Sequence, residues 1–314
     1  MPGGGDAWWR RLLGTRSAAA ADTPPTAVGG RFVLRALLGH GATGSVYLAD
    51  DGRTQAQVAL KLVTLPDSLP AQARDDWCIA FAREALATAR LRHADIVAML
   101  DAGVVAEGGW LALEYVAGTE LTRYTKPQHL LPEALVLRLG ARIARALAHA
   151  HRAGIVHRDL KPSNVRVDLP RGVLKLTDFG IARLNDIAPT RTGLTLGTPA
   201  YMAPEQLRGD AAAAAADTWA LGVLLFELLS GRRPLEASSL GGLLHALAHD
   251  EPADLGAWRP DLPAAVAGLV RQPLQREPAA RPADLDAYAD ALGRQADALG
   301  GGGPGDDPMH NRPT

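Results

Sequence analysis

The sequence predicts an α+β protein with two lobes: a small β-rich lobe containing one key helix, and a larger helical lobe. Short apolar runs of strand character, separated by glycine turns, occupy residues 31–115. From Pro132 onward the apolar residues recur at helical spacing instead. This change of periodicity predicts a boundary near Glu114–Gly118, with one lobe over about 30–114 and the other over about 118–299.

Turn-forming residues bound the apolar runs and define the expected elements in order. The small lobe is expected to hold strands at 32–34, 45–48, 58–63, 97–102 and 110–115, with a helix at about 71–91. The large lobe is expected to hold helices at 133–152, 218–230, 239–249, 263–272 and 284–298.

Length and charge set the broad class of the protein. The chain has 314 residues, 47% of them hydrophobic, which is ample for a sizeable core. Its 33 basic and 34 acidic residues nearly cancel, and only 5% of the residues are aromatic. We therefore expect no nucleic-acid binding, which requires basic or stacking surfaces. The single cysteine, Cys78, allows no intramolecular disulfide and fits a reducing compartment.

The two ends of the sequence are expected to be disordered flanks. Residues 1–29 are rich in Gly, Ala, Pro and Thr, apart from one apolar stub in which Trp8-Trp9 and Leu12-Leu13 are spaced i and i+4. The stub is a candidate docking element for a partner, although a disordered extension is the favoured interpretation. Residues 300–314, rich in Gly, Pro and Asp, predict a disordered tail.

No stretch of the sequence predicts membrane insertion. The most apolar stretch, 219–229, has about half of the roughly 20 residues that a span requires. Arg10-Arg11 invites a twin-arginine export signal, but the apolar segment that should follow is poor. We therefore expect a cytoplasmic protein without a transmembrane segment.

A glycine-rich run is the first candidate for chemistry. It reads Gly39-His40-Gly41-Ala42-Thr43-Gly44-Ser45-Val46 and matches G-x-G-x-x-G-x-V, in which glycines let backbone N–H groups approach phosphate oxygens. A dinucleotide-binding fold would start a helix here, whereas this sequence continues as a strand. Glycine turns between strands are common, so the run alone indicates little. The candidates for phosphate and nucleotide contacts are Gly39, Gly41, Gly44 and Val46.

Lys61 and Glu84 form a candidate ion pair. Lys61 lies in an otherwise apolar strand and needs an anionic partner, unless it faces solvent at an alternating position. Glu84 falls within the apolar face of the expected helix, among Trp77, Phe81 and Thr88. A carboxylate buried there lowers the stability of the fold unless it is paired with a cation. The alternative is that Glu84 bends out to solvent. Pairing would fix the lysine where it can hold phosphates.

The strongest pattern combines two motifs in order. Residues 157–164 have H-R-D-x-x-x-x-N spacing, and Asp178-Phe179-Gly180 follows fourteen residues later. Phosphoryl transfer needs positioning and neutralisation of charge. Asp159 would accept the hydrogen bond of the attacking hydroxyl, and Lys161 would neutralise the transferring group. Asn164 and Asp178 are hard oxygen ligands suited to Mg²⁺.

From Arg31 to Leu299 the chain resembles the eukaryotic-like (Hanks-type) serine/threonine protein kinases of bacteria, which implies their bilobal fold. Residues 197–205 resemble the end of a kinase activation loop, and Asp217 resembles the aspartate that supports the catalytic-loop backbone. Arg281 stands where the family's arginine pairs with the glutamate that is Glu205 here. The resemblance implies ATP and Mg²⁺ as cofactors, with Mn²⁺ as an alternative metal, and protein Ser/Thr hydroxyls as acceptors.

The resemblance also implies further nucleotide contacts and a regulatory loop. Glu114 and Val116 are expected to hold adenine, with Leu113 as the gatekeeper, and Ala59 is a further nucleotide contact. Arg158 precedes the catalytic aspartate, which predicts pairing with a phosphorylated threonine of the loop. The candidate threonines are Thr190, Thr192 and Thr195, with autophosphorylation expected at Thr190 or Thr192 unless they are merely solvated.

Two other functions stay open. A pseudokinase scaffold usually lacks the phosphate-binding lysine, the catalytic aspartate or the metal-binding aspartate. Here Lys61, Asp159 and Asp178 stand at these positions. A small-molecule phosphotransferase of kinase-like fold typically lacks the Glu205 and Arg281 pair. Regulation is expected through another protein, homodimer contacts or the N-terminal extension. His245 and His249 have metal-compatible spacing but no evident third ligand.

Overall fold

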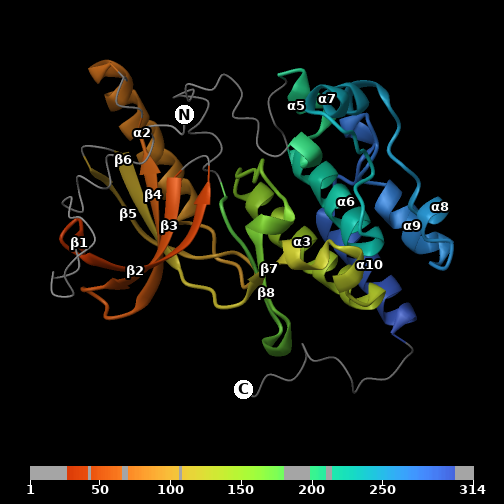
Figure 1. Ribbon diagram of the computed structural model, residues 1–314, viewed down its shortest axis with the longest axis horizontal. Coiled ribbons are helices and arrows are strands. Elements are labelled where there is room, and N and C mark those ends of the chain that lie inside the picture. The colour runs from red at the N-terminus through yellow and green to blue at the C-terminus, as the bar shows by residue number, and fades with distance from the viewer. Residues whose placement is uncertain are drawn as a thin grey trace. The chain divides into compact units, whose positions relative to one another are not determined.

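The computed structural model describes residues 27–41, 44–65, 70–105, 108–179, 199–209 and 214–300 (Figure 1). These form two compact units. The described part of the first unit covers residues from 27 to 90 and from 98 to 116, and that of the second covers 91–97, from 117 to 179, and from 199 to 300. Contrary to the expected lobe of 30–114, the segment 91–97 therefore belongs to the second unit, although it joins two elements of the first.

The first unit is an antiparallel sheet with a single helix against it. The strand order is β1-β2-β3-β4-β6-β5, and the helix is α2. The bounds are β1 Ala27–Val28, β2 Phe32–Gly41, β3 Gly44–Asp51, β4 Gln57–Thr64, α2 Ala71–Thr88, β5 Met99–Val105 and β6 Gly108–Glu114.

Several strand boundaries differ from the expectation, and two of the differences concern the N-terminal side of the sheet. Ala27 and Val28 pair with Val33 and Phe32, so these residues belong to the sheet and not to a flexible extension. The strand β2 also continues through the glycine-rich run to Gly41, because backbone pairing with β3 outweighs the low strand propensity of glycine. Residues 42–43 lie outside the described chain.

The two faces of the sheet bury different partners. One face carries a core of Phe32, Ala49, Leu60, Leu62 and neighbouring apolar residues. The other face receives α2, which packs on β5 and β6. A Cβ at Gly109 would lie 2.6 Å from the Phe81 ring, so the helix approaches the strand as closely as glycine allows.

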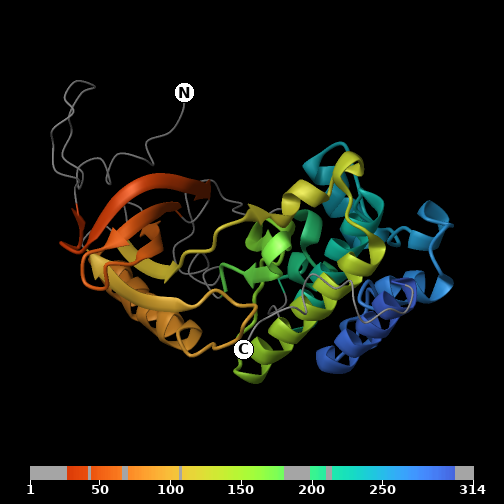
Figure 2. The ribbon, with the colours of Figure 1, turned by 90° about the horizontal axis from the view of Figure 1, so that it is seen from below.

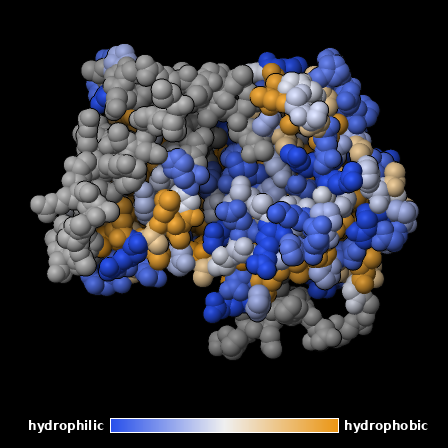
Figure 3. Space-filling model, in the orientation of Figure 1, coloured by the Kyte–Doolittle hydropathy of each residue, from blue (hydrophilic) through white to orange (hydrophobic). Residues whose placement is uncertain are grey.

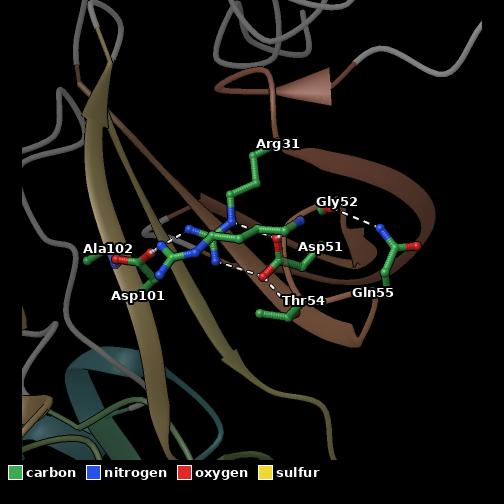
Figure 4. Close-up of polar contacts among 8 residues, drawn as sticks. Arg31, Asp51, Gly52, Thr54, Gln55, Asp101 and Ala102 are labelled. Atoms are coloured by element: carbon green, nitrogen blue, oxygen red, sulfur yellow. Dashed lines mark hydrogen bonds and ion pairs between the residues drawn. The ribbon is translucent and has the colours of Figure 1, made fainter.

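Ion pairs join the start of β2 to β3 and β5 (Figure 4). The Arg31 guanidinium lies 2.6 and 2.7 Å from the two carboxylate oxygens of Asp51 and 2.5 Å from Asp101 Oδ2. Thr54 Oγ1 and the Arg53 backbone N–H also donate to Asp51, which is 2% exposed. These donors hold the pKa of the Asp51 carboxyl well below its usual range.

The second unit is helical with a small sheet. Its longest helix, α3, spans Glu133–Arg152, as the periodicity predicts, whereas α6 begins at Ala214, four residues before the expected start. Its main elements are β7 Thr119–Glu120, α3, β8 Val165–Asp168, β9 Val173–Leu176, α5 Pro204–Leu207, α6 Ala214–Ser230, α7 Leu240–His249, α8 Leu255–Trp258, α9 Ala264–Arg271 and α10 Leu285–Leu299; short 3-10 turns lie at Leu121–Tyr124, Pro127–His129, Pro162–Asn164, Leu169–Arg171, Pro199–Tyr201 and Pro278–Ala280.

The helices α3 and α10 lie side by side and run antiparallel (Figure 2). Three exposed Arg–Asp pairs, seven residues apart on α3, join them: Arg138–Asp297, Arg145–Asp290 and Arg152–Asp286. Hydrophilic residues cover most of this unit's face in Figure 3, because its helices bury their apolar side chains. Among the described helices, none combines the length and apolar character that crossing a bilayer demands.

Candidate active site

In the first unit, sheet register places the predicted nucleotide contacts on one face. Val46 pairs with Lys61 across β3 and β4, and Leu48 pairs with Ala59. Residues directly opposite each other share a face, and so do residues two apart along a strand. Val46, Ala59 and Lys61 therefore line the same face, together with Leu113, which pairs with Ala59 from β6.

The same register places Lys61 on the face covered by α2. Lys61 and Val63 are two residues apart, and Val63 pairs with Gly109, over which Phe81 packs. Glu84 lies one turn beyond Phe81 on α2 and is half-buried, while Lys61 is 5% exposed. This arrangement supports the expected pairing of Lys61 with Glu84, which stays a prediction.

The glycines of the run have unequal structural roles. Gly44 has φ +138°, and a Cβ there would lie 1.8 Å from the Leu62 carbonyl oxygen. Gly44 is therefore required by the close approach of β4. Among the described residues, no atom lies within 4 Å of a Cβ at Gly39. That position leaves room beside the backbone, as contact with a phosphate would need.

Two hydrogen bonds between Glu114 and the backbone of Ala98 fix the end of β6. The Glu114 N–H donates to the Ala98 carbonyl at 2.9 Å, and Glu114 Oε2 accepts from the Ala98 N–H at 3.1 Å. The Ala98 N–H thereby fixes the Glu114 carboxylate against the start of β5. Val116, two residues later, is 8% exposed. Both predicted adenine contacts thus lie at a fixed strand end.

In the second unit, the predicted catalytic residues surround one carboxylate. Lys161 Nζ lies 2.7 Å from Asp159 Oδ2. Asn164 Nδ2 donates to the same oxygen at 3.0 Å and to the Asp159 carbonyl at 2.8 Å. These donors orient the carboxylate and place an ammonium group beside it, as a proton-accepting group near a transferring phosphoryl requires.

A buried aspartate on α6 accepts hydrogen bonds from the backbone of this loop. Asp217, 1% exposed, accepts from the His157 N–H at 2.8 Å and from the Arg158 N–H at 2.7 Å, which bears out the expected support. Arg158 adopts φ +67°, uncommon for a residue with a side chain. His151 Nε2 on α3 lies 2.8 Å from Asp217 Oδ2, a contact that no pattern in the sequence indicates.

Asp178 directly follows Thr177, the residue whose backbone is hydrogen-bonded to Asn164. The Thr177 N–H donates to the Asn164 carbonyl at 2.9 Å, since β9 pairs with β8. Asp178 has φ +64°, and Phe179 packs its ring 4.4 Å from that of His157. A non-glycine residue held in this region marks a position whose conformation the surroundings impose.

The donor set of this unit fits a hard divalent cation. Because Asn164 Nδ2 donates to Asp159, its amide oxygen is turned away from that carboxylate and can serve as a ligand. Asp178 adds a carboxylate from the adjoining strand end, and Mg²⁺ prefers such oxygens. The residues therefore fit the expected metal.

Two further features connect the region of residues 199–207 to the helices. Arg281 makes a bidentate ion pair with Glu205 at 2.6 and 2.8 Å, with both side chains buried, as the resemblance implies. Tyr201 donates its hydroxyl to Glu227, and burial raises the pKa of the Glu227 carboxyl. Both contacts fix this region on α6 and the C-terminal part of the chain.

Some predicted residues lie outside the described chain or stand apart. Gly180, the candidate phosphosites Thr190, Thr192 and Thr195, and residues 197–198 are not described. His245 and His249 are exposed on α7 with ring centroids 4.7 Å apart. In the described ranges, no group of three or more His, Cys, Asp or Glu side chains could hold a metal ion there or elsewhere.

Comparison with known proteins identifies a family match over residues 32–291, described as the protein kinase domain. Serine/threonine-protein kinase pkn3 of Myxococcus xanthus is 36% identical over 271 residues, 82% of this chain and 48% of pkn3. PrkC of Bacillus subtilis is 34% identical over 253 residues, 80% of this chain and 38% of PrkC. PknA of Mycobacterium tuberculosis is 37% identical over 271 residues, 84% of this chain and 61% of PknA. The chain thus spans about half the length of these relatives.

Proposed function

This chain is a member of the protein kinase domain family, and from that membership we propose that it is a serine/threonine protein kinase that uses ATP and Mg²⁺. The observation that supports the proposal most strongly is the Asp159 carboxylate, held by Lys161 and Asn164 on a loop whose backbone Asp217 supports. Curated relatives that carry the name serine/threonine-protein kinase support the acceptor class.

In the proposed reaction, Asp159 accepts the hydrogen bond of a protein Ser or Thr hydroxyl and orients its oxygen toward the γ-phosphorus. Lys161 neutralises negative charge on the transferring group. Asn164 and Asp178 would hold Mg²⁺, which supplies neutralisation of phosphate charge when bound. The new bond joins the hydroxyl oxygen to the γ-phosphorus, ADP leaves, and the hydroxyl proton is released.

We assign the residues of the first unit to the same nucleotide. Lys61, fixed by Glu84, would hold phosphates, and Gly39, Gly41 and Gly44 would offer backbone N–H groups to them. Val46 and Ala59, on the same sheet face as Lys61, are the apolar contacts for adenine, with Glu114 and Val116 at its edge. Mn²⁺ is the alternative metal.

Regulation and partners belong to the same proposal. Arg158, in its left-handed conformation, would pair with a phosphothreonine at position 190, 192 or 195 after autophosphorylation. The proposal also includes protein substrates, a homodimer, a partner for the N-terminal stub and a cytoplasmic location.

The test is transfer of radiolabelled γ-phosphate from ATP to peptides that differ only in a Ser, Thr or Tyr acceptor. We expect transfer to the Ser and Thr peptides, reduced about 10²–10⁴-fold by Asp159→Asn. The control is Asp290→Asn, which changes an exposed carboxylate of α10 and should retain wild-type transfer. ATP binding without any transfer would favour a pseudokinase scaffold, and wild-type transfer by Asp159→Asn would refute the assigned role.

A further inference from the structure

The segment 91–97, which joins α2 to β5, is hydrogen-bonded to the end of β9. The Val97 N–H donates to the Leu176 carbonyl at 2.9 Å, and the Leu176 N–H donates to the Asp95 carbonyl at 2.8 Å. Lys175 Nζ lies 3.4 Å from the Ile96 carbonyl oxygen. The segment thus acts as a short extra strand beside the last residues of β9.

An ion pair fixes this segment to α3. The Arg142 guanidinium contacts both carboxylate oxygens of Asp95, with Nε 3.2 Å from each and Nη2 closest to Oδ1. Asp95 is 7% exposed. A pair this buried is costly to break, because removing either side chain leaves the other charge without compensation.

The same guanidinium also reaches the start of β9. Arg142 Nη1 donates at 2.8 Å to the carbonyl of Gly172, the residue directly before Val173. One side chain therefore holds β9 at both ends: at its start through Gly172, and at its end through Asp95, whose carbonyl accepts from Leu176. Asp178 follows two residues after Leu176.

We propose that Asp95 and Arg142 are positioning residues for Asp178: by holding both ends of β9, they fix where this strand delivers the metal-binding carboxylate. The inference rests on the proposed function, in which Asp178 is a ligand of Mg²⁺. Removing a group that orients a metal ligand without itself binding the metal typically lowers metal affinity 10–100-fold.

Exposed pairs on the same helix provide the contrast. Arg145 lies one turn from Arg142 on α3, and it pairs with Asp290 at 2.7 Å with both side chains about half exposed. Among the described residues, neither partner of this pair forms a hydrogen bond or an ion pair with β9. Arg145→Met is therefore a matched control for Arg142→Met: the same helix, the same substitution and the loss of an Arg–Asp pair.

The first measurement is amide hydrogen exchange on the full chain without nucleotide. In Arg142→Met, exchange at Val97 and Leu176 should rise about tenfold or more, because their hydrogen bonds depend on the held segment. Arg145→Met should leave both amides as in the wild type. Unchanged exchange in Arg142→Met would overturn the proposal.

The second measurement is the Mg²⁺ concentration that gives half-maximal transfer at saturating ATP. We expect an increase of about tenfold in Arg142→Met, a smaller increase in Asp95→Asn, which keeps one acceptor, and none in Arg145→Met. A merely structural role would lower the folded fraction without changing this concentration, and that result would overturn the proposal. If Arg142→Met does not fold, Asp95→Asn and Arg142→Lys decide by the same criterion. A wild type without transfer refutes the proposed function instead, and with it the premise.

Discussion

The two units position their candidate residues by different physical means. In the first unit, Val46, Ala59 and Lys61 are placed by backbone pairing, since strand register alone decides which face each side chain occupies. In the second unit, Asp159 and Asp178 lie outside regular elements and are placed by side chains that bond to backbone groups, such as those of Asp217 and Asn164. The first unit should therefore be sensitive to backbone clashes, and the second to loss of single polar side chains.

The strongest test of this contrast is the buried ion pair of the second unit. Arg281→Met should lower the free energy of unfolding by about 3–5 kcal/mol, because it leaves the buried Glu205 carboxylate uncompensated. Urea denaturation measures the change. The double variant Glu205→Leu/Arg281→Met should recover part of the loss. A loss below about 1 kcal/mol for the single variant would mean that this pair contributes little.

A glycine pair tests the first unit. Gly44→Ala should cost about 2–3 kcal/mol, because its Cβ would meet the Leu62 carbonyl and push β3 away from β4. Gly39→Ala is the control, since no atom of the described residues lies within 4 Å of a Cβ there. The measurement is unfolding of each variant without nucleotide. Equal losses at the two positions would contradict the different roles assigned to them.

The side-chain cluster of the first unit predicts a pH dependence. The donors around Asp51 lower its pKa in the folded state, so its contribution to stability is present above the unfolded pKa of about 4 and is lost as pH falls below it. Asp51→Asn should therefore be about 2 kcal/mol less stable than the wild type at pH 6, and the difference should shrink toward pH 3. Its neighbour Asp50, which forms a more exposed pair with Arg35, supplies the control Asp50→Asn. A difference that grows on acidification would reverse the sign predicted here.

The exposed pairs between α3 and α10 should matter least. Asp290→Ala removes a pair with both partners in solvent and should change the free energy of unfolding by about 0.5 kcal/mol or less. The change should vanish in high salt, because salt screens exposed charges. A salt-independent loss of more than about 1 kcal/mol in the free energy of unfolding would contradict the small contribution assigned to these pairs.

Local patterns predicted the regular elements well. The helix α3 has the expected bounds because an amphipathic run of twenty residues lies between Pro132 and the turn at Gly154. The apolar runs predicted the strands β3 and β4, but not the register that puts Val46 and Lys61 on one face, because burial along β4 does not alternate. The Glu205–Arg281 pair was expected from the resemblance to the kinases, and the structure contains it.

Contacts between distant parts of the chain that belong to no recognised motif could not be predicted. The segment 91–97 has no periodicity of its own, and its place is decided by hydrogen bonds to Leu176, some eighty residues later. His151 reads as a helix-end residue until Asp217, 66 residues away, is placed beside it. The extension of β2 through Gly41 depends on pairing with β3, which outweighs local propensity.

The central proposal is that Lys61 and Asp178 act on one nucleotide. Calorimetric titration of ATP with Mg²⁺ into the wild type, Lys61→Met, Asp178→Asn and the double variant tests it most directly. We expect binding by the wild type and non-additive losses, with a coupling energy of about 0.5–3 kcal/mol, because both side chains act on the same phosphates. No binding by the wild type, or strictly additive losses, would contradict the account.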